Sequence, residues 1–409
     1  MNLRSGFLKF SHLLFTATVL LGLTGKPVEA ATYYVAPTGT DSNSGTQSQP
    51  FRTIDKGITV LIAGDTLYVR GGVYAEWFNN NLPGGTSWSN PITIASFPGE
   101  SVTIRPGMGA ERVLTIARSS SQYLIIDGFV LDGINVSSDT VKITHGSTTG
   151  AAHHIRIKNC EVKNGFGQGI LVSSESHYNE FINLDIHHNG RDSARPDKYH
   201  GIYVTSKYNL IEGCRIHDNP AYGVHLYAAG GVGVDSNTVR NNRIYSNPDC
   251  GILISSGVGN VVYNNLVWGN RGYGGIRADY GAFNSKIYNN TSYANTGNGI
   301  LIGSGSNGTE IMNNLTFNNA IANLSNGGTA TVSQFNLNGI DPKFVNPSAL
   351  DFRLQAGSPA IDAGAVLATI TSDILGAPRP VGPRFDIGAF EYQSSPSAAA
   401  GPSNLRILP

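Results

Sequence analysis

A repeat of about 24 residues runs through the middle of this 409-residue chain. A glycine followed by an isoleucine returns every 24 residues, at Gly251-Ile252, Gly275-Ile276 and Gly299-Ile300. An asparagine closes each repeat, at spacings of 23, 25 and 24 residues, at Asn247, Asn270, Asn295 and Asn319. A fixed period in the twenties, built from short apolar runs without the 3.6-residue periodicity of helices, predicts a β-solenoid in which each repeat forms one lap.

The apolar positions of the repeats predict which residues line the core. Side chains alternate along a strand, so one apolar column of each sheet points inward. We expect one core column of Ile170, Ile202, Val224, Ile252, Ile276 and Ile300, and another of Val162, Ile186, Ile216, Ile244 and Val267. Paired asparagines at the turns are better explained by amides stacked along the axis than by sugar binding: Asn241-Asn242, Asn264-Asn265, Asn289-Asn290 and Asn313-Asn314. The chain is therefore predicted to be an all-β, single-stranded parallel β-helix of about ten laps.

The two ends of the chain lack this period and predict separate segments. Residues 1–30 combine Arg4 and Lys9 with an apolar run and a small-residue cleavage site, as in a secretory signal peptide. Residues 31–66 are expected to form an N-terminal cap with a short helix at 53–62, and residues 67–335 the β-helix. Residues 336–393 are expected to cover the C-terminal end of the stack, and residues 394–409 to form a Ser/Pro/Ala linker.

Composition limits the compartment and the partners. Without residues 1–30 the chain has 25 Lys and Arg against 27 Asp and Glu, a net charge of −2, which argues against a nucleic-acid partner. The N-terminal apolar run is short for a membrane span, so we expect a secreted, extracellular monomer without stable membrane insertion. Cys160 and Cys214 fall in one column two laps apart, ~9.6 Å by the strand spacing. That distance is beyond the reach of a disulfide, so both are expected to be buried and reduced.

The residues that follow the first core column are expected to point outward. This row holds Leu171, Tyr203, His225, Leu253, Arg277 and Leu301, and a second row, two residues further along, holds Ser173, Thr205, Tyr227, Ser255, Asp279 and Gly303. Together the rows predict one polar and aromatic strip. Aromatic rings can stack on sugars, arginine can bind a carboxylate through two hydrogen bonds, and histidine or tyrosine can transfer a proton.

An insertion of about eight residues lies beside this strip, in the sequence GRDSARPDKYHG between Asn189 and Ile202. It contains Arg191, Asp192, Arg195, Asp197 and Lys198, although only 14% of the chain is charged, and it leads into His200. Insertions in a solenoid form loops on its faces, which often line the binding surface. We expect this loop to form one wall of a groove, with Arg191, Arg195 and Tyr222 as substrate contacts beside Tyr227 and Asp279.

Plainer explanations compete with these roles. Exposed aromatic residues pair well across strands, and Arg277 and Asp279 can form a simple surface ion pair. The turn histidines His187, His188 and His217 would usually only face solvent. Asp192 and Asp197 are candidate calcium ligands, but no dense Asp-x-Asp-x-Asp run supports them, and the sequence predicts no other cofactor.

The entry YYVAPTGTDSNSG, FRTIDKGI and AGDTLYVRGGVY resembles the start of pectate-lyase-like proteins of polysaccharide lyase family 9. The same entry, and the DIGAFEY ending, are similar to a wider group of uncharacterised bacterial β-helix proteins. The resemblance implies a right-handed helix of three parallel sheets that binds sugars along one sheet. It also implies calcium-binding aspartates in a DGFD lap and a lysine base in a GFKLGG lap. This chain departs from both, because the corresponding positions are Tyr222, His225 and Leu253.

The leading interpretation is a secreted enzyme that acts on a uronate-containing polysaccharide, as a β-eliminating lyase or a related C5-epimerase. Both reactions begin by removing the proton α to a carboxylate. The candidates are, for the base, His225 or Tyr203; for the carboxylate partner, Arg277 or Lys198; and for the acid, Tyr227 or His200. Two alternatives stay open: a non-catalytic glycan-binding surface or matrix module, and a glycoside hydrolase, which would need a second carboxyl beside Asp279.

Overall fold

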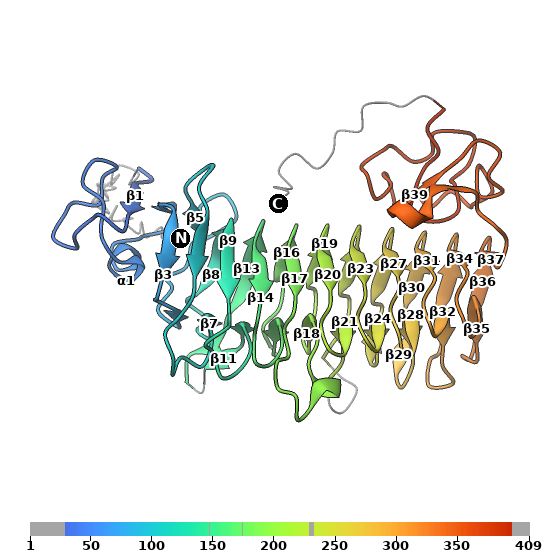
Figure 1. Ribbon diagram of the computed structural model, residues 1–409, viewed down its shortest axis with the longest axis horizontal. Coiled ribbons are helices and arrows are strands. Elements are labelled where there is room, and N and C mark those ends of the chain that lie inside the picture. Colours follow the sequence, from blue (N-terminus) through green and yellow to red (C-terminus); the bar gives the residue numbers. More distant parts are fainter. Residues whose placement is uncertain (1–28, 147, 174, 229–232, 395–409) are drawn as a thin grey trace, which may run out of the picture.

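The computed structural model describes residues 29–146, 148–173, 175–228 and 233–394. The predicted signal peptide and terminal linker lie almost wholly outside these ranges. Within them the short apolar runs pair in parallel into three long sheets, here called A, B and C, and the chain visits them in that order on each lap (Figure 1). The fold is the predicted right-handed parallel β-helix.

The described residues give twelve strands in sheet A, eleven in sheet B and ten in sheet C. Sheet A holds β1 (Thr32–Val35), β2 (Thr66–Val69), β5 (Ile92–Ser96), β8 (Gln122–Asp127), β13 (His153–Lys158), β16 (Glu180–Ile182), β19 (Leu210–Glu212), β22 (Thr238–Arg240), β26 (Val261–Tyr263), β30 (Lys286–Tyr288), β33 (Glu310–Met312) and β36 (Val332–Gln334). Sheet B holds β3 (Gly72–Tyr74), β6 (Val102–Ile104), β9 (Phe129–Asp132), β14 (Glu161–Lys163), β17 (Asp185–His187), β20 (Arg215–His217), β23 (Arg243–Tyr245), β27 (Leu266–Trp268), β31 (Thr291–Tyr293), β34 (Leu315–Phe317) and β37 (Leu337–Asn338). Sheet C holds β4 (Phe78–Asn79), β7 (Leu114–Ile116), β10 (Val141–Ile143), β15 (Ile170–Val172), β18 (Ile202–Val204), β21 (Tyr222–Leu226), β24 (Cys250–Ile254), β28 (Gly274–Ala278), β32 (Asn298–Ile302) and β35 (Leu324–Asn326).

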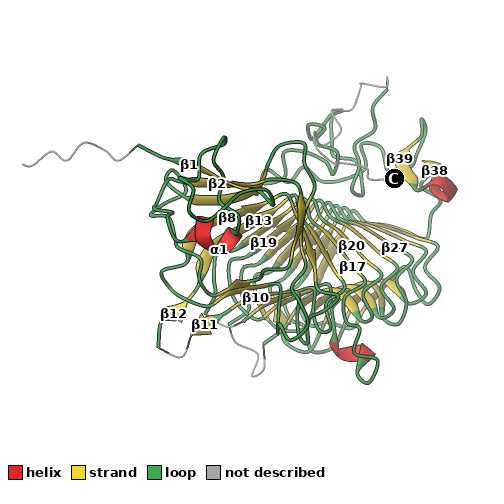
Figure 2. Cartoon of the chain, turned by 60° about the vertical axis from the view of Figure 1, so that its left-hand side comes forward, coloured by secondary structure: helices red, strands yellow, loops and turns green. Residues whose placement is uncertain are grey.

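Several short strands and helical turns lie outside the three sheets. Two strands form an antiparallel hairpin, β11 (His145–Gly146) with β12 (Gly150–Ala151), and β25 (Gly257–Val258) pairs in parallel with β29 (Ala282–Phe283). The helical turns are α1 (Ile54–Ile58), η1 (Pro196–Lys198) and η2 (Pro347–Ala349). Figure 2 shows the three sheets as a stack of strands, with η1 on the protruding loop. No helix in the described ranges is long and apolar enough to cross a bilayer.

Both predicted core columns are confirmed. The first pairs in register from Ile170 to Ile300 on sheet C, and the second from Val162 to Val267 on sheet B. Every member is buried, with an exposure of 0% or 1%. The period of two residues along each strand therefore places the apolar side chains inside, as the sequence indicates.

Lack of space explains why a glycine directly precedes the core isoleucine or valine on these strands of sheet C. A Cβ on Gly223 would lie 2.5 Å from Cγ2 of Ile244 and 2.6 Å from the carbonyl oxygen of Gly251 on the next lap. The next glycine of the column, Gly251, would meet the carbonyl of Gly275 at 2.7 Å. Side chains of any size would force the laps apart at this corner.

Asparagine ladders fix the turns. Of the predicted pairs, the second members form such a ladder, whereas Asn264 and Asn289 among the first members donate to backbone carbonyls of the C-terminal segment. Nδ2 of Asn247 donates to Oδ1 of Asn270 at 3.0 Å, and Asn270 repeats this bond to Asn295 at 3.1 Å. Two further ladders follow the same pattern: Asn242 to Asn265, Asn290 and Asn314, and Asn179 to Asn209, Asn237 and Asn260. The buried amides thereby satisfy one another along the axis.

The three cysteines are free and buried, which confirms the prediction for Cys160 and Cys214. Burial raises the pKa of each thiol to about 12. The cysteines therefore act as small core residues.

The N-terminal helix is shorter than predicted. It covers Ile54–Ile58 only, with the hydroxyl of Thr53 accepting from the backbone N–H of Lys56 at the N-cap. Asp65 ends the helical region by accepting the backbone N–H of Ile62, which is 52% exposed. Ile54 and Ile58 are buried against the first laps.

The C-terminal segment covers the flank of the solenoid, whereas we expected it to cover the end. Its strands β38 (Phe344–Asn346) and β39 (Asp351–Leu354) pack beside sheet B (Figure 1). The ring of Phe352 lies 5.6 Å from that of Trp268 and 5.2 Å from that of Tyr293. At the end of sheet A, Val332 on β36 stays 43% exposed. The reason is the outward row of sheet B, which becomes aromatic on its last laps and so offers an apolar flank.

Candidate functional site

The predicted outward rows lie on sheet C as expected. Tyr203 on β18 pairs with His225 on β21, His225 pairs with Leu253 on β24, and Leu253 pairs with Arg277 on β28. A side chain in these rows can point away from the core and still be covered. Leu253, for example, is only 3% exposed. The strip is therefore divided into two groups with Leu253 between them.

The first group is an aromatic cluster of five predicted site residues. The His225 ring stacks on Tyr203, with ring centroids 5.0 Å apart, and on Tyr227 at 5.4 Å. His200 packs edge-on against His225 at 4.7 Å and stacks on Tyr222 at 4.7 Å. The turn before β18 and strands β18 and β21 thus bring together residues that lie up to 27 positions apart in the sequence, from His200 to Tyr227.

Hydrogen bonds assign the tautomers of both histidines. The backbone N–H of Tyr222 donates to Nδ1 of His200 at 3.4 Å, so the hydrogen of His200 is on Nε2. Nε2 then donates to Nδ1 of His225 at 3.1 Å, and Nε2 of His225 donates to Oγ of Ser255 at 2.9 Å. Because His225 donates this hydrogen bond to Ser255, it cannot activate Ser255 as a nucleophile, for which it would have to accept the hydrogen of the serine.

Burial keeps this cluster uncharged. It is the main cause that holds the pKa of His200 well below its usual value, with the nearby His225 and Lys198 adding to the effect. Burial also lowers the pKa of His225 to about 3 and raises the pKa of Tyr203 to about 12. At neutral pH both imidazoles are neutral and the phenol keeps its proton, so Tyr203 is better suited to donate a proton than to accept one.

Arg277 and Asp279 form the second group and make the simple ion pair considered above. Nη2 of Arg277 donates to Asp279 at 2.7 Å and to the hydroxyl of Tyr280 at 2.9 Å. The guanidinium lies between the rings of Tyr273 and Tyr280, at 3.9 and 4.8 Å from their centroids. Nε and Nη1 are buried and have no hydrogen-bond partner among the described residues. A polymer can reach Tyr273 and Tyr280, which are 43% and 63% exposed, but not the guanidinium they cover.

Asp249 is a candidate site residue that the outward rows did not reveal. It lies on the turn before β24, close to the Tyr222 hydroxyl and the backbone N–H of Tyr273. Burial raises the pKa of Asp249, although these two groups and the positive charge of Arg277 lower it. A carboxylate with a raised pKa is a better general base than an ordinary one. The signal was present in the sequence as an acidic residue two positions before the Gly251-Ile252 step.

The inserted loop is held to the preceding lap at both ends. Near its start, the backbone N–H of Asp192 donates to the carbonyl of Phe166 at 3.1 Å. Near its end, the side-chain amide of Gln168 donates to the carbonyl of Lys198 at 2.8 Å and accepts the backbone N–H of His200. Gln168, which sequence reasoning missed, therefore positions His200.

The charged residues of the loop do not converge on one site. Arg195 and Tyr199 both donate to Asp192, and Lys198 pairs with Asp197 at 2.9 Å on the exposed tip. Arg191 donates from Nε to the carbonyl of Asn164 at 2.7 Å and from Nη2 to that of Ile134 at 2.8 Å. It therefore lies along the turn between sheets B and C, and not over sheet C.

The donor set does not fit the calcium site that the resemblance implies. Tyr222 and His225 stand at the aspartate positions, and both ring nitrogens of His225 are already hydrogen-bonded. Asp192 and Asp197 are each paired with residues of their own loop. Among the described residues there is no group of three or more His, Cys, Asp or Glu placed to hold a metal ion.

Comparisons with known proteins agree with this architecture. The model of the family described as "Pel9A-like, right handed beta helix region" matches residues 33–320. Pectate lyase PEL9 of Emericella nidulans is 25% identical over 210 residues, 49% of this chain and 51% of that protein. The uncharacterized protein YwoF of Bacillus subtilis is 29% identical over 133 residues, 32% of this chain and 28% of that protein. The chain thus spans about half of the first of these relatives and less of the second.

The crystal structure of pectate lyase Pel9A superimposes with a TM-score of 0.69 at 18% identity, covering 89% of this chain and 97% of that chain. At this identity the likeness concerns the fold. The family match covers well over half of the residues and includes nearly every lap of sheets A, B and C. This chain belongs to the family of Pel9A-like right-handed β-helix proteins.

Proposed function

We propose that this protein is an extracellular enzyme that acts on a uronate-containing polysaccharide along the outer face of sheet C, by β-elimination or by the C5-epimerisation that shares its first step. The observation that carries the proposal is the proximity of Asp249, a half-buried carboxylate with a raised pKa, to the hydroxyl of Tyr222. Exposed tyrosines flank this pair. Family membership and the similarity to PEL9 support a polysaccharide as substrate.

Asp249 takes the role of the base in this proposal. His225 is less suited to it, because its Nδ1 lone pair already accepts a hydrogen bond from His200. We assign His225 a positioning role, in which it holds the ring of Tyr203. Lys198, with its ammonium on the exposed tip of the loop, replaces the covered Arg277 as the group that holds the uronate carboxylate. The loop tip lies near the base, since the charge of Asp197 contributes to the raised pKa of Asp249.

Asp249 as the base and Tyr222 as the acid account for every proton that moves in the elimination step. Asp249 accepts the C5 proton, the C–H electron pair becomes the C4=C5 double bond, and the C4–O4 bond breaks. Tyr222 protonates the leaving oxygen and regains a proton from the nearby Asp249. In epimerisation the glycosidic bond stays intact and a proton returns to the opposite face of C5. Tyr227, Tyr273 and Tyr280 offer ring surface for the neighbouring sugars.

Turnover of pectate, alginate and glycosaminoglycans tests the proposal. A lyase raises the ultraviolet absorbance of the unsaturated product, whereas an epimerase leaves absorbance flat and changes the uronate ratio measured by NMR. We expect Asp249→Asn to lower the rate about a hundredfold or more, as loss of a general base does. Tyr208→Phe, an exposed tyrosine at the turn into sheet A, is the matched control and should keep the wild-type rate. An active Asp249→Asn variant would place the base elsewhere.

A non-catalytic glycan-binding module is the second candidate. It is favoured by the closed hydrogen-bond chain from His200 to Ser255, which leaves no free imidazole nitrogen in the cluster. Glycan binding without absorbance change or epimerisation on any of these polymers would support the module and count against the enzyme.

A further inference from the structure

A groove follows the turns that lead from sheet B into sheet C, and its lining residues are not those of the aromatic cluster. Its volume is about 510 Å³. The turns of five successive laps line it, with Asn164, His188, Asn189, Arg191, Asp218, Asn219, Pro220, Ser246, Pro248, Gly269 and Arg271. The groove therefore runs along the axis, in the direction in which an extended polymer could lie.

Backbone conformation turns one row of residues toward this groove. At each turn the residue before the buried asparagine of the ladder has a positive φ: 54° at His188, 51° at Asp218 and 54° at Ser246. Such values are uncommon for residues other than glycine. The structure thus places a histidine, a carboxylate and a hydroxyl next to one another on three successive laps.

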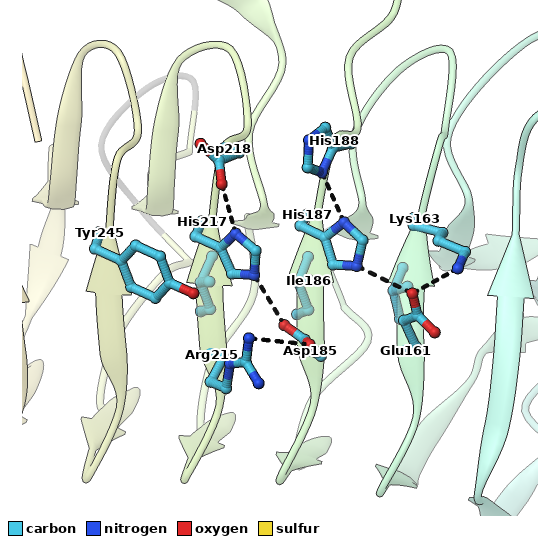
Figure 3. A network of polar contacts seen from close by, with 12 residues as sticks. Glu161, Lys163, Asp185, Ile186, His187, His188, Arg215, His217, Asp218 and Tyr245 are labelled. Carbon is cyan, nitrogen blue, oxygen red and sulfur yellow. Dashed lines mark hydrogen bonds and ion pairs between the residues drawn. The ribbon is translucent and has the colours of Figure 1, made fainter. Parts of the chain in front are cut away.

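Figure 3 shows a hydrogen-bond relay that ends at the groove histidine. Nε2 of His187 lies 3.1 Å from the carboxylate of Glu161, which can only accept, because His187 and Lys163 together lower the pKa of Glu161 to about 2. In the neutral form of His187, its Nδ1 then accepts from Nδ1 of His188 at 2.7 Å. The second nitrogen of His188, Nε2, keeps its lone pair, and the exposed His188 lines the groove.

On the next lap a histidine again bonds through both ring nitrogens, but the residue at the groove is a carboxylate and not a second histidine. His217 bonds to Asp185 through Nε2 at 3.1 Å and to Asp218 through Nδ1 at 2.7 Å (Figure 3). Both partners are carboxylates, so both nitrogens donate and the ring is an imidazolium. Burial alone would lower the pKa of His217, but these two bonds outweigh burial and raise it. The charge of Asp218 is therefore balanced and does not repel an anion in the groove.

Arginines stand at the two ends of the groove. Backbone carbonyls hold Arg191 through Nε and Nη2, while the exposed side chain of Arg271 makes no hydrogen bond or ion pair with any described residue. Three lap steps separate them, ~14 Å by the strand spacing. Between them, Pro220 and Pro248 give apolar surface. Arg271 can bind a carboxylate through two paired N–H groups, whereas Arg191 keeps Nη1 and its positive charge for a ligand.

We propose that this groove is a second carbohydrate site, which binds a short uronate oligosaccharide with its carboxylates on Arg191 and Arg271 and a hydroxyl on Nε2 of His188. The ring faces of the sugars lie on Pro220 and Pro248. The choice of uronate rests on the substrate class proposed for sheet C, but the groove itself is built from other residues.

Titration of the full chain with a galacturonate trisaccharide tests the groove. We expect binding to the wild type, and about tenfold weaker binding to Arg271→Gln and to Arg191→Gln, because each variant loses a paired charge. Arg118→Gln, which removes an exposed arginine at the turn after β7, is the matched control and should bind as the wild type does. The fully methyl-esterified trisaccharide should not bind. Equal affinity of the wild type and the Arg191→Gln/Arg271→Gln double variant, or no binding to the wild type, would overturn the proposal.

Nitrogen-15 NMR of the histidine rings gives a readout that is independent of turnover. The relay predicts that His188 carries its hydrogen on Nδ1, that its Nε2 signal moves on binding of the trisaccharide, and that Glu161→Gln disturbs both. A hydrogen on Nε2 of His188 would refute the relay and the donation of a sugar hydroxyl to that nitrogen. The sheet C proposal is tested separately by turnover in Asp249→Asn, which should bind the trisaccharide in the groove as the wild type does.

Discussion

Two histidines on the same lap, one on sheet B and one on sheet C, show how strongly the surroundings of a residue decide its chemistry. His225 and His217 both point outward from a β-ladder and both stack between aromatic rings. His225 has only neutral partners, so burial lowers its pKa to about 3. His217 lies between two carboxylates, so its pKa is raised. One ring is therefore a neutral spacer and the other a fixed positive charge.

Replacement of His225 by glutamine should make the protein less sensitive to acid. In the unfolded chain the pKa of the imidazole is about 6.5, while in the folded chain it is about 3. Between these values the unfolded state binds the additional proton, so the free energy of unfolding falls as the pH falls. The loss is on the order of 1 kcal/mol for each pH unit.

Urea unfolding between pH 7 and about pH 4 measures this effect. The free energies of wild type and His225→Gln should converge as the pH is lowered, whereas His145→Gln, at an exposed histidine, should run parallel to wild type. Parallel curves for His225→Gln would show that the ring is not buried in its neutral form.

The sequence predicted which residues point outward on sheet C but not which of them solvent can reach. The register of Tyr203, His225 and Arg277 follows from the two-residue period of strands and the 24-residue period of laps. Arg277 is covered by Tyr273 and Tyr280, which come from the turns on either side of β28. Turn residues have no period, so their position over a strand could not be predicted from the pattern.

At the level of elements, the loop between β17 and β18 differs most from the regular laps. Its start and end are fixed by the preceding lap, and its tip carries the exposed pair of Asp197 and Lys198. The apolar core gains nothing from the loop, since η1 has no buried residue. The sequence indicated the loop through its length and charge. It did not indicate that Gln168 holds the loop, because Gln168 and Lys198 are 30 residues apart in the sequence.

Replacement of residues 192–198 by a short Gly-Ser link should separate stability from function. We expect the melting temperature to stay nearly unchanged, because no core contact is lost and loop length has only a small entropic effect. Polysaccharide turnover should disappear, since the link lacks the ammonium of Lys198. Calorimetry and the absorbance assay measure the two quantities, and full turnover in the shortened protein would exclude the loop from the sheet C site.

On the scale of the whole molecule, the C-terminal segment acts as a lateral cover. It packs on the last laps of sheet B, while the earlier laps of that sheet keep charged side chains and the histidine relay at the surface. Backbone groups of the segment also bond to turn asparagines, including Asn289 and Asn313. The sequence could not predict this docking, because the segment has no period that relates it to a particular sheet.

Phe352→Ala should destabilise the protein by about 3–5 kcal/mol, the usual cost of removing a buried phenylalanine. Phe352 is 1% exposed and contacts the rings of Trp268, Tyr293 and Phe344. Denaturant unfolding followed by tryptophan fluorescence measures the loss, and Leu350→Ala, at an exposed leucine, serves as the control. A loss equal to that of the control would mean that the segment is not docked in solution.

The asparagine ladders have a consequence for how proteins of this kind can change in length. Each ladder amide bonds to the amides of the laps directly before and after it and to backbone carbonyls of its own and the preceding lap, and each glycine corner meets only the adjacent lap. Duplication of a whole lap would therefore restore every one of these contacts, while insertion of part of a lap would shift all three ladders out of register. Gene rearrangements that add or remove complete laps should be tolerated, and they would lengthen or shorten any sugar-binding surface by one ~4.8 Å step at a time.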